Sequence, residues 1–288
     1  MVSPLANVTH RYADVNGVRL HYVEAGSGPL VVLLHGFPDF WYSWRHQIPA
    51  LVAAGYRVVA PDMRGYNLSD KPAAVADYDV DKLAADVAGL IAACGEEKAM
   101  VAGHDWGAGV AWWFAMHHPD RLSRLAILNV PHPERMLRGL RDPRQLLRSW
   151  YMLFFQIPGL PEAVMRAGRY RVLREMMRKD PLRPGAFTPN DIDRYVEAAA
   201  QSGGLRGPIN YYRALFRRGA ASVPLRRIEA PVLVIWGQQD RYLRPELAEP
   251  DPKWVPDCRV ERIADASHWV HMDQPDRVSG LLLDFLRG

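Results

Sequence analysis

Cysteine is scarce in this sequence of 288 residues, where it occurs only at Cys94 and Cys258. The two cysteines form no CxxC pair and no metal-ligand spacing, which argues against a disulfide framework and fits a reducing compartment. Long apolar runs are also absent, since the longest, such as PLVVLL and VAWWFAM, are far too short to span a bilayer. The N-terminal stretch MVSPLANVTHRYADVNG lacks the charged-then-apolar layout of an export signal. We therefore expect a cytoplasmic protein without a membrane span.

Neither sign of charge dominates, because the net charge is only +4, but the charge is unevenly distributed. Residues 132–222 hold 17 of the 36 lysines and arginines and only 8 of the 32 acidic residues. Arginine-rich segments can bind nucleic acids. These arginines, however, recur at helical spacings among alanines and leucines, as do Arg166, Arg169, Arg174 and Arg178. No nucleic-acid motif accompanies them, so we interpret them as a solvated helix face and expect no nucleic-acid partner.

Hydrophobic periodicity in the first 131 residues alternates between strand and helix patterns. Asn16-Gly17 is a strong hairpin turn and joins predicted strands at 8–15 and 18–25. The other predicted elements are strands at 29–36, 56–62, 98–103 and 124–130, and helices at 41–55, at 80–95 and from Ala108. Strands that alternate with helices form right-handed βαβ units, so we expect a mostly parallel sheet.

The pattern changes at residue 132, and from there to about residue 222 only helical stretches interrupted by proline and glycine occur. After Val223 the alternation resumes with strands at 230–237 and 259–265 and a terminal helix from Pro275. The sequence therefore predicts an α/β fold in two parts. Residues 1–131 and 223–288 form a core with a mostly parallel sheet flanked by helices, and residues 132–222 form an inserted helical cap.

The stretch GHDWGAG, at 103–109, lies between a predicted strand and a predicted helix. Gly103 and Gly107 leave room for a sharp turn, which would expose the central residue above the carboxyl edge of the sheet. A serine in place of Asp105 would give the G-x-S-x-G elbow of the α/β-hydrolases. An aspartate here can instead simply cap the following helix. This stretch alone does not decide between a nucleophile and a capping residue.

Two later residues complete a possible triad with Asp105. A nucleophile of this kind needs a histidine, and the histidine needs an orienting acid. In α/β-hydrolases the acid follows the nucleophile along the chain and the histidine comes last. Asp240 follows the predicted strand VLVIWG, and His268 lies in a predicted loop after the last strand. His271 is the nearest rival, but we expect it on the helix side of that loop.

Five segments together resemble the epoxide hydrolases of the α/β-hydrolase fold: HGFPDFWYSWRHQ, PDMRGYNLSDKP, GHDWGAG, WGQQDRYL and SHWVHMDQP. They occur in the order of that family and extend over essentially the whole chain, which implies an α/β-hydrolase core with a cap. The resemblance implies that Asp105 attacks the epoxide, and that His268 and Asp240 activate water. One departure is Asn67, which stands where many relatives have glycine. Asparagine tolerates left-handed backbone conformations, so we expect the loop to be preserved.

The resemblance also implies two cap tyrosines that hold the epoxide oxygen. WYMLFFQIPG, at 150–159, places Tyr151 in the first position, and GGLRGPINYYR, at 203–213, places Tyr212 in the second. Aromatic residues in helices usually only pack in a core, but here each lies within a matched segment. Tyr211 is adjacent to Tyr212, yet consecutive helical residues point about 100° apart, so only one of them should face the site.

The expected chemistry explains the choice of aspartate. Attack on a saturated epoxide carbon by serine would leave an ether, whereas a carboxylate leaves an ester that water can cleave. Asp105 is ionised without a base, tyrosines stay protonated to donate to the alkoxide, and His268 takes the proton from water. The backbone N–H groups of Phe37 and Trp106 are expected to form the oxyanion hole. The resemblance suggests a cis bond before Pro38. We expect no cofactor and no metal, an apolar small-molecule epoxide as substrate, and a monomer or homodimer.

Two other classes of function, dehalogenation and non-catalytic binding, compete with this prediction. Haloalkane dehalogenases share the aspartate and the tryptophan after it, but often hold the halide with an asparagine where this chain has Phe37. Fluoroacetate dehalogenases carry arginines just after the nucleophile, where this chain has Trp106, Ala108 and Gly109. A non-catalytic binding protein of the same fold usually lacks a triad member, and here a complete set is present. The fold alone does not decide among these.

Overall fold

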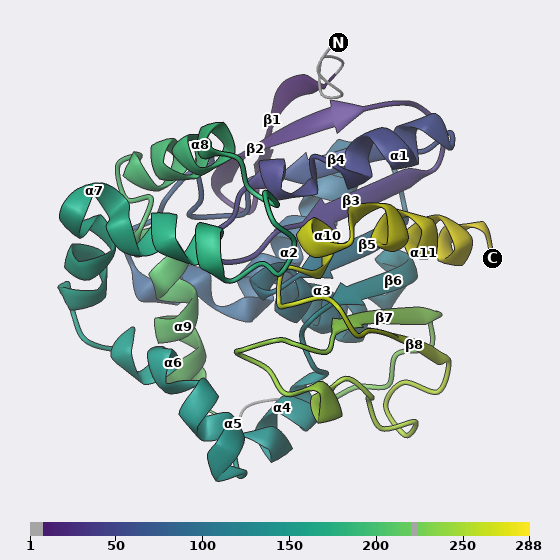
Figure 1. The fold of residues 1–288 in the computed structure, drawn as a ribbon. Coiled ribbons are helices and arrows are strands. Elements are labelled where there is room, and N and C mark those ends of the chain that lie inside the picture. Colours follow the sequence, from purple (N-terminus) through teal and green to yellow (C-terminus); the bar gives the residue numbers. More distant parts are fainter. Residues whose placement is uncertain (1–7, 220–223) are drawn as a thin grey trace.

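The computed structural model describes residues 8–219 and 224–288, and it contains one eight-stranded sheet (Figure 1). The strand order is β1-β2-β4-β3-β5-β6-β7-β8. The first two pairings, β1 with β2 and β2 with β4, are antiparallel, and all the others are parallel. The strands are β1 (Thr9–Val15), β2 (Val18–Ala25), β3 (Leu30–Leu34), β4 (Arg57–Pro61), β5 (Ala99–His104), β6 (Leu122–Leu128), β7 (Val232–Gly237) and β8 (Cys258–Ile263). The predicted mostly parallel sheet is confirmed.

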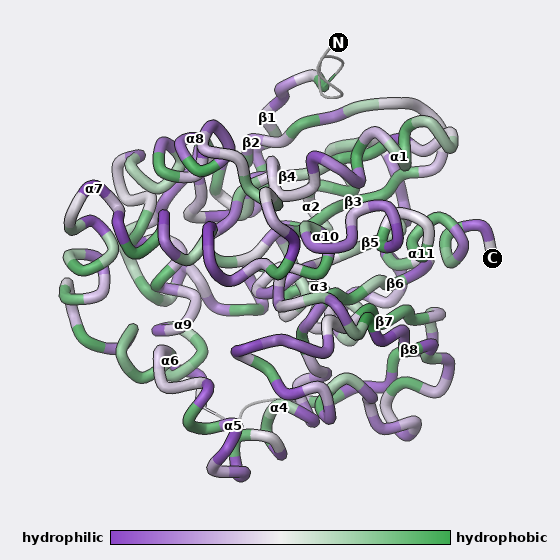
Figure 2. Tube along the Cα trace, viewed as in Figure 1, coloured by the Kyte–Doolittle hydropathy of each residue, from purple (hydrophilic) through white to green (hydrophobic). Residues whose placement is uncertain are grey.

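The alternation of side chains along a strand divides the core into two layers. In β3, Val32 and Leu34 belong to the layer that packs under α2 (Val80–Ala93) and α3 (Trp106–His117). Val31 and Leu33 belong to the opposite layer, under α1 (Gln47–Ala53) and α11 (Pro275–Arg287). Because both faces of the strand are covered, β3 has no polar residue, as expected for a buried parallel strand. In Figure 2 β7 is likewise hydrophobic, whereas the edge strand β8 is more hydrophilic.

Two predicted helices differ from those observed. The single helix predicted at 41–55 is wrong, because the chain forms a short 3-10 helix at Trp41–Trp44 and then α1 at Gln47–Ala53. The physical reason is Pro49, which has no N–H to donate to the carbonyl of Arg45 and is tolerated only in the first turn of a helix. The helix after the elbow begins at Trp106 rather than at Ala108, since the carbonyl of Asp105 already accepts the N–H of Gly109 at 3.0 Å.

Six helices lie between β6 and β7, and the described residues of this segment form no strand. They are α4 (Pro133–Gly139), α5 (Pro143–Arg148), α6 (Trp150–Phe154), α7 (Leu160–Lys179), α8 (Pro189–Ala200) and α9 (Arg206–Arg218). Figure 1 shows them gathered on the side of the sheet away from α11. α7 is interrupted at Ala167–Tyr170, where four residues have non-helical dihedral angles. The predicted boundary between residues 222 and 223 lies outside the described residues.

α9 is held against the core by contacts on two sides. A Cβ on Gly207 would lie 2.3 Å from the carbonyl oxygen of Gly65, so the two backbones meet directly. One turn further on, the Tyr211 hydroxyl donates to the carbonyl of Arg64 at 2.7 Å. At the end of the helix, Arg218 pairs with Asp79 at 2.6 Å. These contacts fix the height and rotation of α9 over the sheet.

The loop after β4, which α9 contacts at Gly65, is shaped by Asn67. Its φ is +37°, in the left-handed region, and its side-chain amide donates to Asp62 at 2.9 Å. Asn67 therefore adopts the left-handed conformation that asparagine tolerates. Among the described residues, no helix combines the length and the hydropathy that crossing a bilayer requires.

Replacing Gly207 by alanine should lower the free energy of unfolding by about 1–3 kcal/mol, because the added methyl group would force α9 away from the backbone of Gly65. Urea unfolding measures this change. Gly280→Ala in α11 is the matched control, since a Cβ there meets nothing within 4 Å, and it should leave stability equal or slightly higher. Equal stability of the two variants would contradict the tight α9 contact.

Candidate active site

Asp105 lies at a sharp turn between β5 and α3. Its φ of 50° and ψ of −124° are unusual for a residue with a side chain. Glycines make this turn possible: a Cβ on Gly107 would lie 2.3 Å from the Leu34 carbonyl, and one on Gly103 would lie 2.5 Å from the Gly107 carbonyl. A Cβ on Gly36 would meet the side chain of Asp105 itself at 2.3 Å. The expected elbow is therefore present, with Asp105 at its apex.

The Asp105 carboxylate is held from two directions. Its Oδ1 accepts the backbone N–H of Phe37 at 2.7 Å, and its Oδ2 lies 3.3 Å from Nε2 of His268. The Phe37–Pro38 bond is cis, as the resemblance to the epoxide hydrolases suggested. Burial alone would raise the pKa of Asp105, but His268, His104 and the Phe37 N–H more than offset it and lower the pKa. Asp105 is therefore ionised at neutral pH.

His268 lies between two carboxylates. Its Nδ1 is 2.7 Å from Oδ2 of Asp240, on the side opposite Asp105. Burial lowers the pKa of His268, but Asp240 and Asp105 outweigh this effect and raise the pKa to about 10. The imidazole is accordingly a cation in the resting protein at neutral pH.

Asp240 is oriented by a dense set of donors. Its Oδ1 accepts the backbone N–H groups of Tyr242 and Leu243 at 2.7 and 2.9 Å, and its Oδ2 accepts the side-chain amide of Asn129 at 2.8 Å. Asn129 is in turn fixed by the N–H of Gly237, which donates to its Oδ1 at 3.0 Å. Sequence reasoning did not find Asn129. The available signal was a polar residue directly after the apolar strand β6, at the same carboxyl edge as Asp105.

The loop that carries His268 is tied to the segment after α7. Both the N–H and the hydroxyl of Ser267 donate to Oδ2 of Asp273, at 2.7 and 2.5 Å. Oδ1 of Asp273 accepts the N–H groups of Leu182 and Arg183 at 2.7 and 2.9 Å. One buried carboxylate thus joins the histidine loop to the helical segment between β6 and β7.

Tyr151 on α6 and Tyr212 on α9 both reach the Asp105 site. Their rings lie 5.9 Å apart, and the Tyr212 ring lies 4.9 Å from that of Trp106. Burial, and then the charge of Asp105, raise the pKa of both tyrosines far above the ordinary value, so both keep their protons. Tyr211 differs, since its hydroxyl is bonded to the core at Arg64.

Two largely apolar cavities meet at Asp105, Tyr151 and Tyr212, which line both. The smaller, of about 180 Å³, extends past Trp106 toward Trp113. The larger, of about 390 Å³, is also lined by His268 and extends between α6 and α7. Six of the seven residues predicted for the site line these cavities, namely Asp105, His268, Tyr151, Tyr212, Phe37 and Trp106. The seventh, Asp240, lies behind His268 and contacts its Nδ1. An apolar molecule with one reactive group fits such a space.

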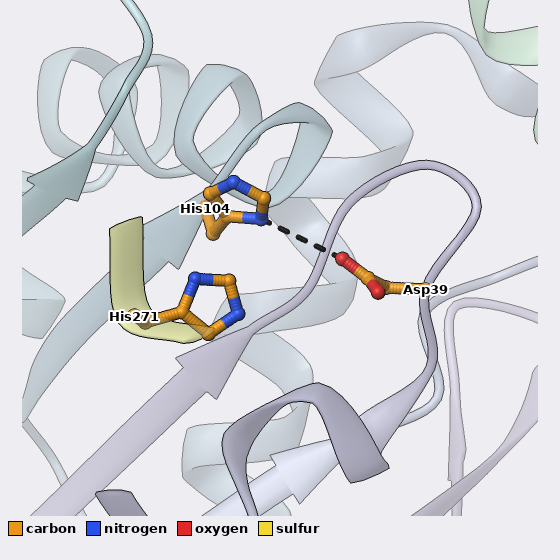
Figure 3. Close-up of side chains that lie close together, drawn as sticks. All are labelled: Asp39, His104 and His271. Carbon is orange, nitrogen blue, oxygen red and sulfur yellow. Dashed lines mark ion pairs between the residues drawn. The ribbon is translucent and has the colours of Figure 1, made fainter. Parts of the chain in front are cut away.

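Figure 3 shows a buried polar cluster that the sequence did not indicate, and the ring of its His104 lies 4.9 Å from that of His268. The cluster consists of Asp39, His104 and His271, whose nearest nitrogen and oxygen atoms all lie within 4.8 Å of one another. His271 belongs to α10 (Val270–Asp273), on the helix side of the loop as expected. The Nδ1 of His104 lies 3.6 Å from Oδ2 of Asp39. His104 also contacts the carbonyl of His268 through Nε2 at 2.9 Å, so the cluster supports the histidine loop from behind.

Comparison with other proteins gives consistent results. Residues 29–275 match the family described as alpha/beta hydrolase fold. AB hydrolase superfamily protein YfhM of Bacillus subtilis is 43% identical over 281 residues, which cover 96% of this chain and 97% of that protein. Epoxide hydrolase 4 of Homo sapiens is 38% identical over 291 residues, which cover 97% of this chain and 79% of that protein.

Solved structures agree with these sequence matches. A mutant of an epoxide hydrolase from Bacillus megaterium superimposes with a TM-score of 0.90 at 34% identity, covering 96% of this chain and 100% of that one. Epoxide Hydrolase A from Mycobacterium thermoresistibile superimposes with a TM-score of 0.84 at 36% identity, covering 98% and 99%.

The raised pKa of His268 predicts how stability depends on pH. The native protein retains this proton up to a pH of about 10, because the pKa of His268 is raised, whereas the unfolded chain releases it near the ordinary histidine pKa of 6.5. This contribution is fully present below pH 6.5, and it is lost at up to about 1.4 kcal/mol per pH unit between the two values. Urea unfolding across this range should show the decline. His268→Gln is the control, and its curve should lack this part of the slope. Identical slopes would contradict a charged His268.

Proposed function

Because the chain belongs to the epoxide hydrolases of the α/β-hydrolase fold, we propose that it converts an apolar epoxide to a vicinal diol through an ester on Asp105. The observation that carries this mechanism is the position of the Asp105 carboxylate. It lies between the Phe37 N–H and His268, where two cavities meet beneath a pair of protonated tyrosines. A carboxylate nucleophile and hydroxyl donors across one apolar space are what ring opening needs.

In the first step, one oxygen of Asp105 attacks a ring carbon, and the bond from that carbon to the epoxide oxygen breaks. The electron pair of that bond goes to the epoxide oxygen, which takes a proton from Tyr151 or Tyr212. Both tyrosines hold their protons because burial and the charge of Asp105 raise each pKa. The products of the step are a hydroxyalkyl ester on Asp105 and a tyrosinate that recovers a proton later.

In the second step, the loss of the negative charge on Asp105 lowers the pKa of His268. Asp105 is one of the two carboxylates that raise the pKa of this imidazole, and the ester no longer carries its negative charge. The pKa of His268 falls, and the proton released can restore the tyrosine. The neutral imidazole then takes a proton from water, while Asp240 at 2.7 Å stabilises the resulting cation.

The ester is cleaved at its carbonyl carbon. Water adds there, and the negative charge develops on the carbonyl oxygen. The N–H of Phe37, which already donates to Oδ1 at 2.7 Å, supports the proposal of an oxyanion hole on that side. We assign the N–H of Trp106, the next residue after the nucleophile, as its second donor. Collapse of the adduct breaks its bond to the alkoxide oxygen of the product, which takes the proton of the added hydroxyl group, so that the diol leaves and the Asp105 carboxylate is restored.

A haloalkane or haloacid dehalogenase is the alternative function on this fold. Such an enzyme holds a departing halide with side-chain donors, but Phe37 offers only a hydrocarbon ring at the expected position. Tyr151 and Tyr212 favour an alkoxide leaving group, which needs a proton that a halide does not need. The purified protein should therefore form diol from an aryl or alkyl epoxide and release no halide from the matching chloroalkane. The reverse result would establish the dehalogenase.

We propose that residues 132–222 act as a cap over a core of residues 1–131 and 223–288. In this arrangement α6 and α9 supply the tyrosines, while the core supplies the triad.

The mechanism needs no cofactor and no metal. Both cysteines are free, which supports a cytoplasmic location. A monomer or homodimer suffices, because one chain holds every group that the reaction uses.

His268→Gln should stop the reaction at the ester, because glutamine cannot take the proton from water. After incubation with an epoxide, mass spectrometry should find the mass of the substrate added to the peptide that contains Asp105. Asp105→Asn, which lacks the nucleophile, is the control and should remain unmodified. Full diol turnover by His268→Gln with an unmodified peptide would refute the mechanism.

Tyr151→Phe and Tyr212→Phe should each slow the formation of the ester by about 10–100-fold, because one donor to the alkoxide is lost and the other remains. Stopped-flow measurement of the alkylation step in the His268→Gln background separates ring opening from ester hydrolysis. Tyr12→Phe is the control, since this exposed tyrosine lies on β1 and lines neither cavity, and its rate should not change. Unaltered alkylation in both test variants would refute the assignment of the tyrosines.

A further inference from the structure

An unusually apolar surface surrounds the opening of the larger cavity. We call it the rim patch and define it by six exposed side chains on α5, α6 and α7 and the turn between α6 and α7. These are Leu147 (74% exposed), Trp150 (62%), Leu153 (56%), Ile157 (44%), Val164 (37%) and Val172 (43%). Isolated exposed apolar residues are ordinary, but a group of them on successive helices, three of which line one cavity, is typical of a binding surface.

The rim patch is continuous with the candidate active site. Trp150, Val164 and Val172 line the larger cavity, which also contains Asp105 and His268. The same side chains are therefore the rim of the opening and part of the exposed surface. A molecule that leaves an apolar phase at the rim patch can reach Asp105 without crossing a polar layer.

Exposed arginines border the rim patch. Arg141, Arg144, Arg166, Arg169 and Arg171 are exposed, and among the described residues none of them takes part in an ion pair. The two acidic residues between Arg141 and Arg171 form ion pairs with arginines outside this segment.

Asp142 pairs with Arg244, and Glu162 pairs with Arg213. Figure 2 shows that hydrophobic and hydrophilic residues are mixed along α5–α7. Apolar side chains, one of them a tryptophan, beside unpaired arginines are the composition of an interfacial membrane-binding surface.

We propose that the rim patch docks on the surface of an anionic phospholipid bilayer, with the larger cavity opening toward the lipid. Anionic headgroups complement the arginines, and the acyl boundary accepts Trp150 and the leucines. A second copy of this chain fits less well, because a symmetric contact through the rim patch would bring the arginines of both copies together. No helix of the described residues spans a membrane, so the contact is peripheral.

Docking has a consequence for substrate supply, and this part rests on the proposed function. Apolar epoxides partition into lipid, so a cavity that opens toward the bilayer takes its substrate from the phase where it is concentrated. The diol product is more polar and leaves more readily into water. Docking itself depends only on the surface, so it can be measured without any epoxide.

The test is sedimentation of the full chain with vesicles of phosphatidylcholine alone and of phosphatidylcholine mixed with phosphatidylglycerol. The wild-type chain should bind the mixed vesicles at low salt, bind the neutral vesicles at least tenfold more weakly, and dissociate at high salt. No binding to the mixed vesicles, or equal binding to both kinds at any salt concentration, would overturn the proposal.

Matched variants locate the contact. Arg144→Gln with Arg166→Gln should lower the partition coefficient about 25-fold, or about fivefold for each arginine. Arg277→Gln with Arg287→Gln is the control, since these exposed arginines lie on α11 at the far side of the molecule, and binding should not change (Figure 1). Equal losses in the two pairs would show only a general effect of charge and would overturn the assignment.

The apolar part of the contact is tested with Leu147→Ser and Leu153→Ser together, two residues outside the lining of the larger cavity. Binding to mixed vesicles should fall at least tenfold, while diol formation from a water-soluble epoxide without vesicles stays unchanged. If sedimentation equilibrium instead shows a wild-type dimer that this double variant abolishes, the rim patch binds a second copy and the lipid proposal is wrong. Vesicle binding without diol formation would support docking and refute only the proposed function.

Discussion

The buried ion pairs of His268 are the interaction on which the rest of the site depends. An imidazolium taken out of water is costly, and two carboxylates on opposite sides offset that cost only if both are held in place. The sheet provides this, because Asp105 and Asp240 follow parallel strands that end at one edge. Backbone N–H groups of Phe37, Tyr242 and Leu243 then fix the carboxylates. In the proposed mechanism, the same arrangement makes the histidine a cation before alkylation and a base after it.

The tyrosines depend on a different kind of constraint, which is backbone contact. Tyr212 reaches the site because Gly207 allows α9 to touch the loop at Gly65, and because Tyr211 is bonded to Arg64. A shift of α9 along its axis would move Tyr212 relative to Asp105 and leave the triad unchanged. The reaction therefore draws on two separately built parts of the chain, one for the ester and one for the proton.

Much of this arrangement could be predicted from the sequence, because the informative features are local. The run LVVLL, the turn at Asn16-Gly17 and the glycines around Asp105 each specify their own backbone, and those predictions are confirmed. Predictions failed where a residue acts across the chain or against the local pattern. Asn129 binds Asp240 at a sequence distance of 111 residues, and no local periodicity reveals such a pair. The helix at 41–55 fits an apolar spacing, but the missing N–H of Pro49 divides it.

Asp273 joins two parts of the molecule that lie far apart in the sequence, the loop that carries His268 and the segment after α7. Its carboxylate accepts from Ser267, beside His268, and also from the backbone at Leu182 and Arg183, which follows α7. α7 is interrupted at Ala167–Tyr170, well before this anchored end. The second half of the helix supplies Val172 and Met176 to the wall of the larger cavity, and it leads directly into this anchored end. One buried carboxylate therefore ties the position of the cavity wall to that of the loop that carries His268.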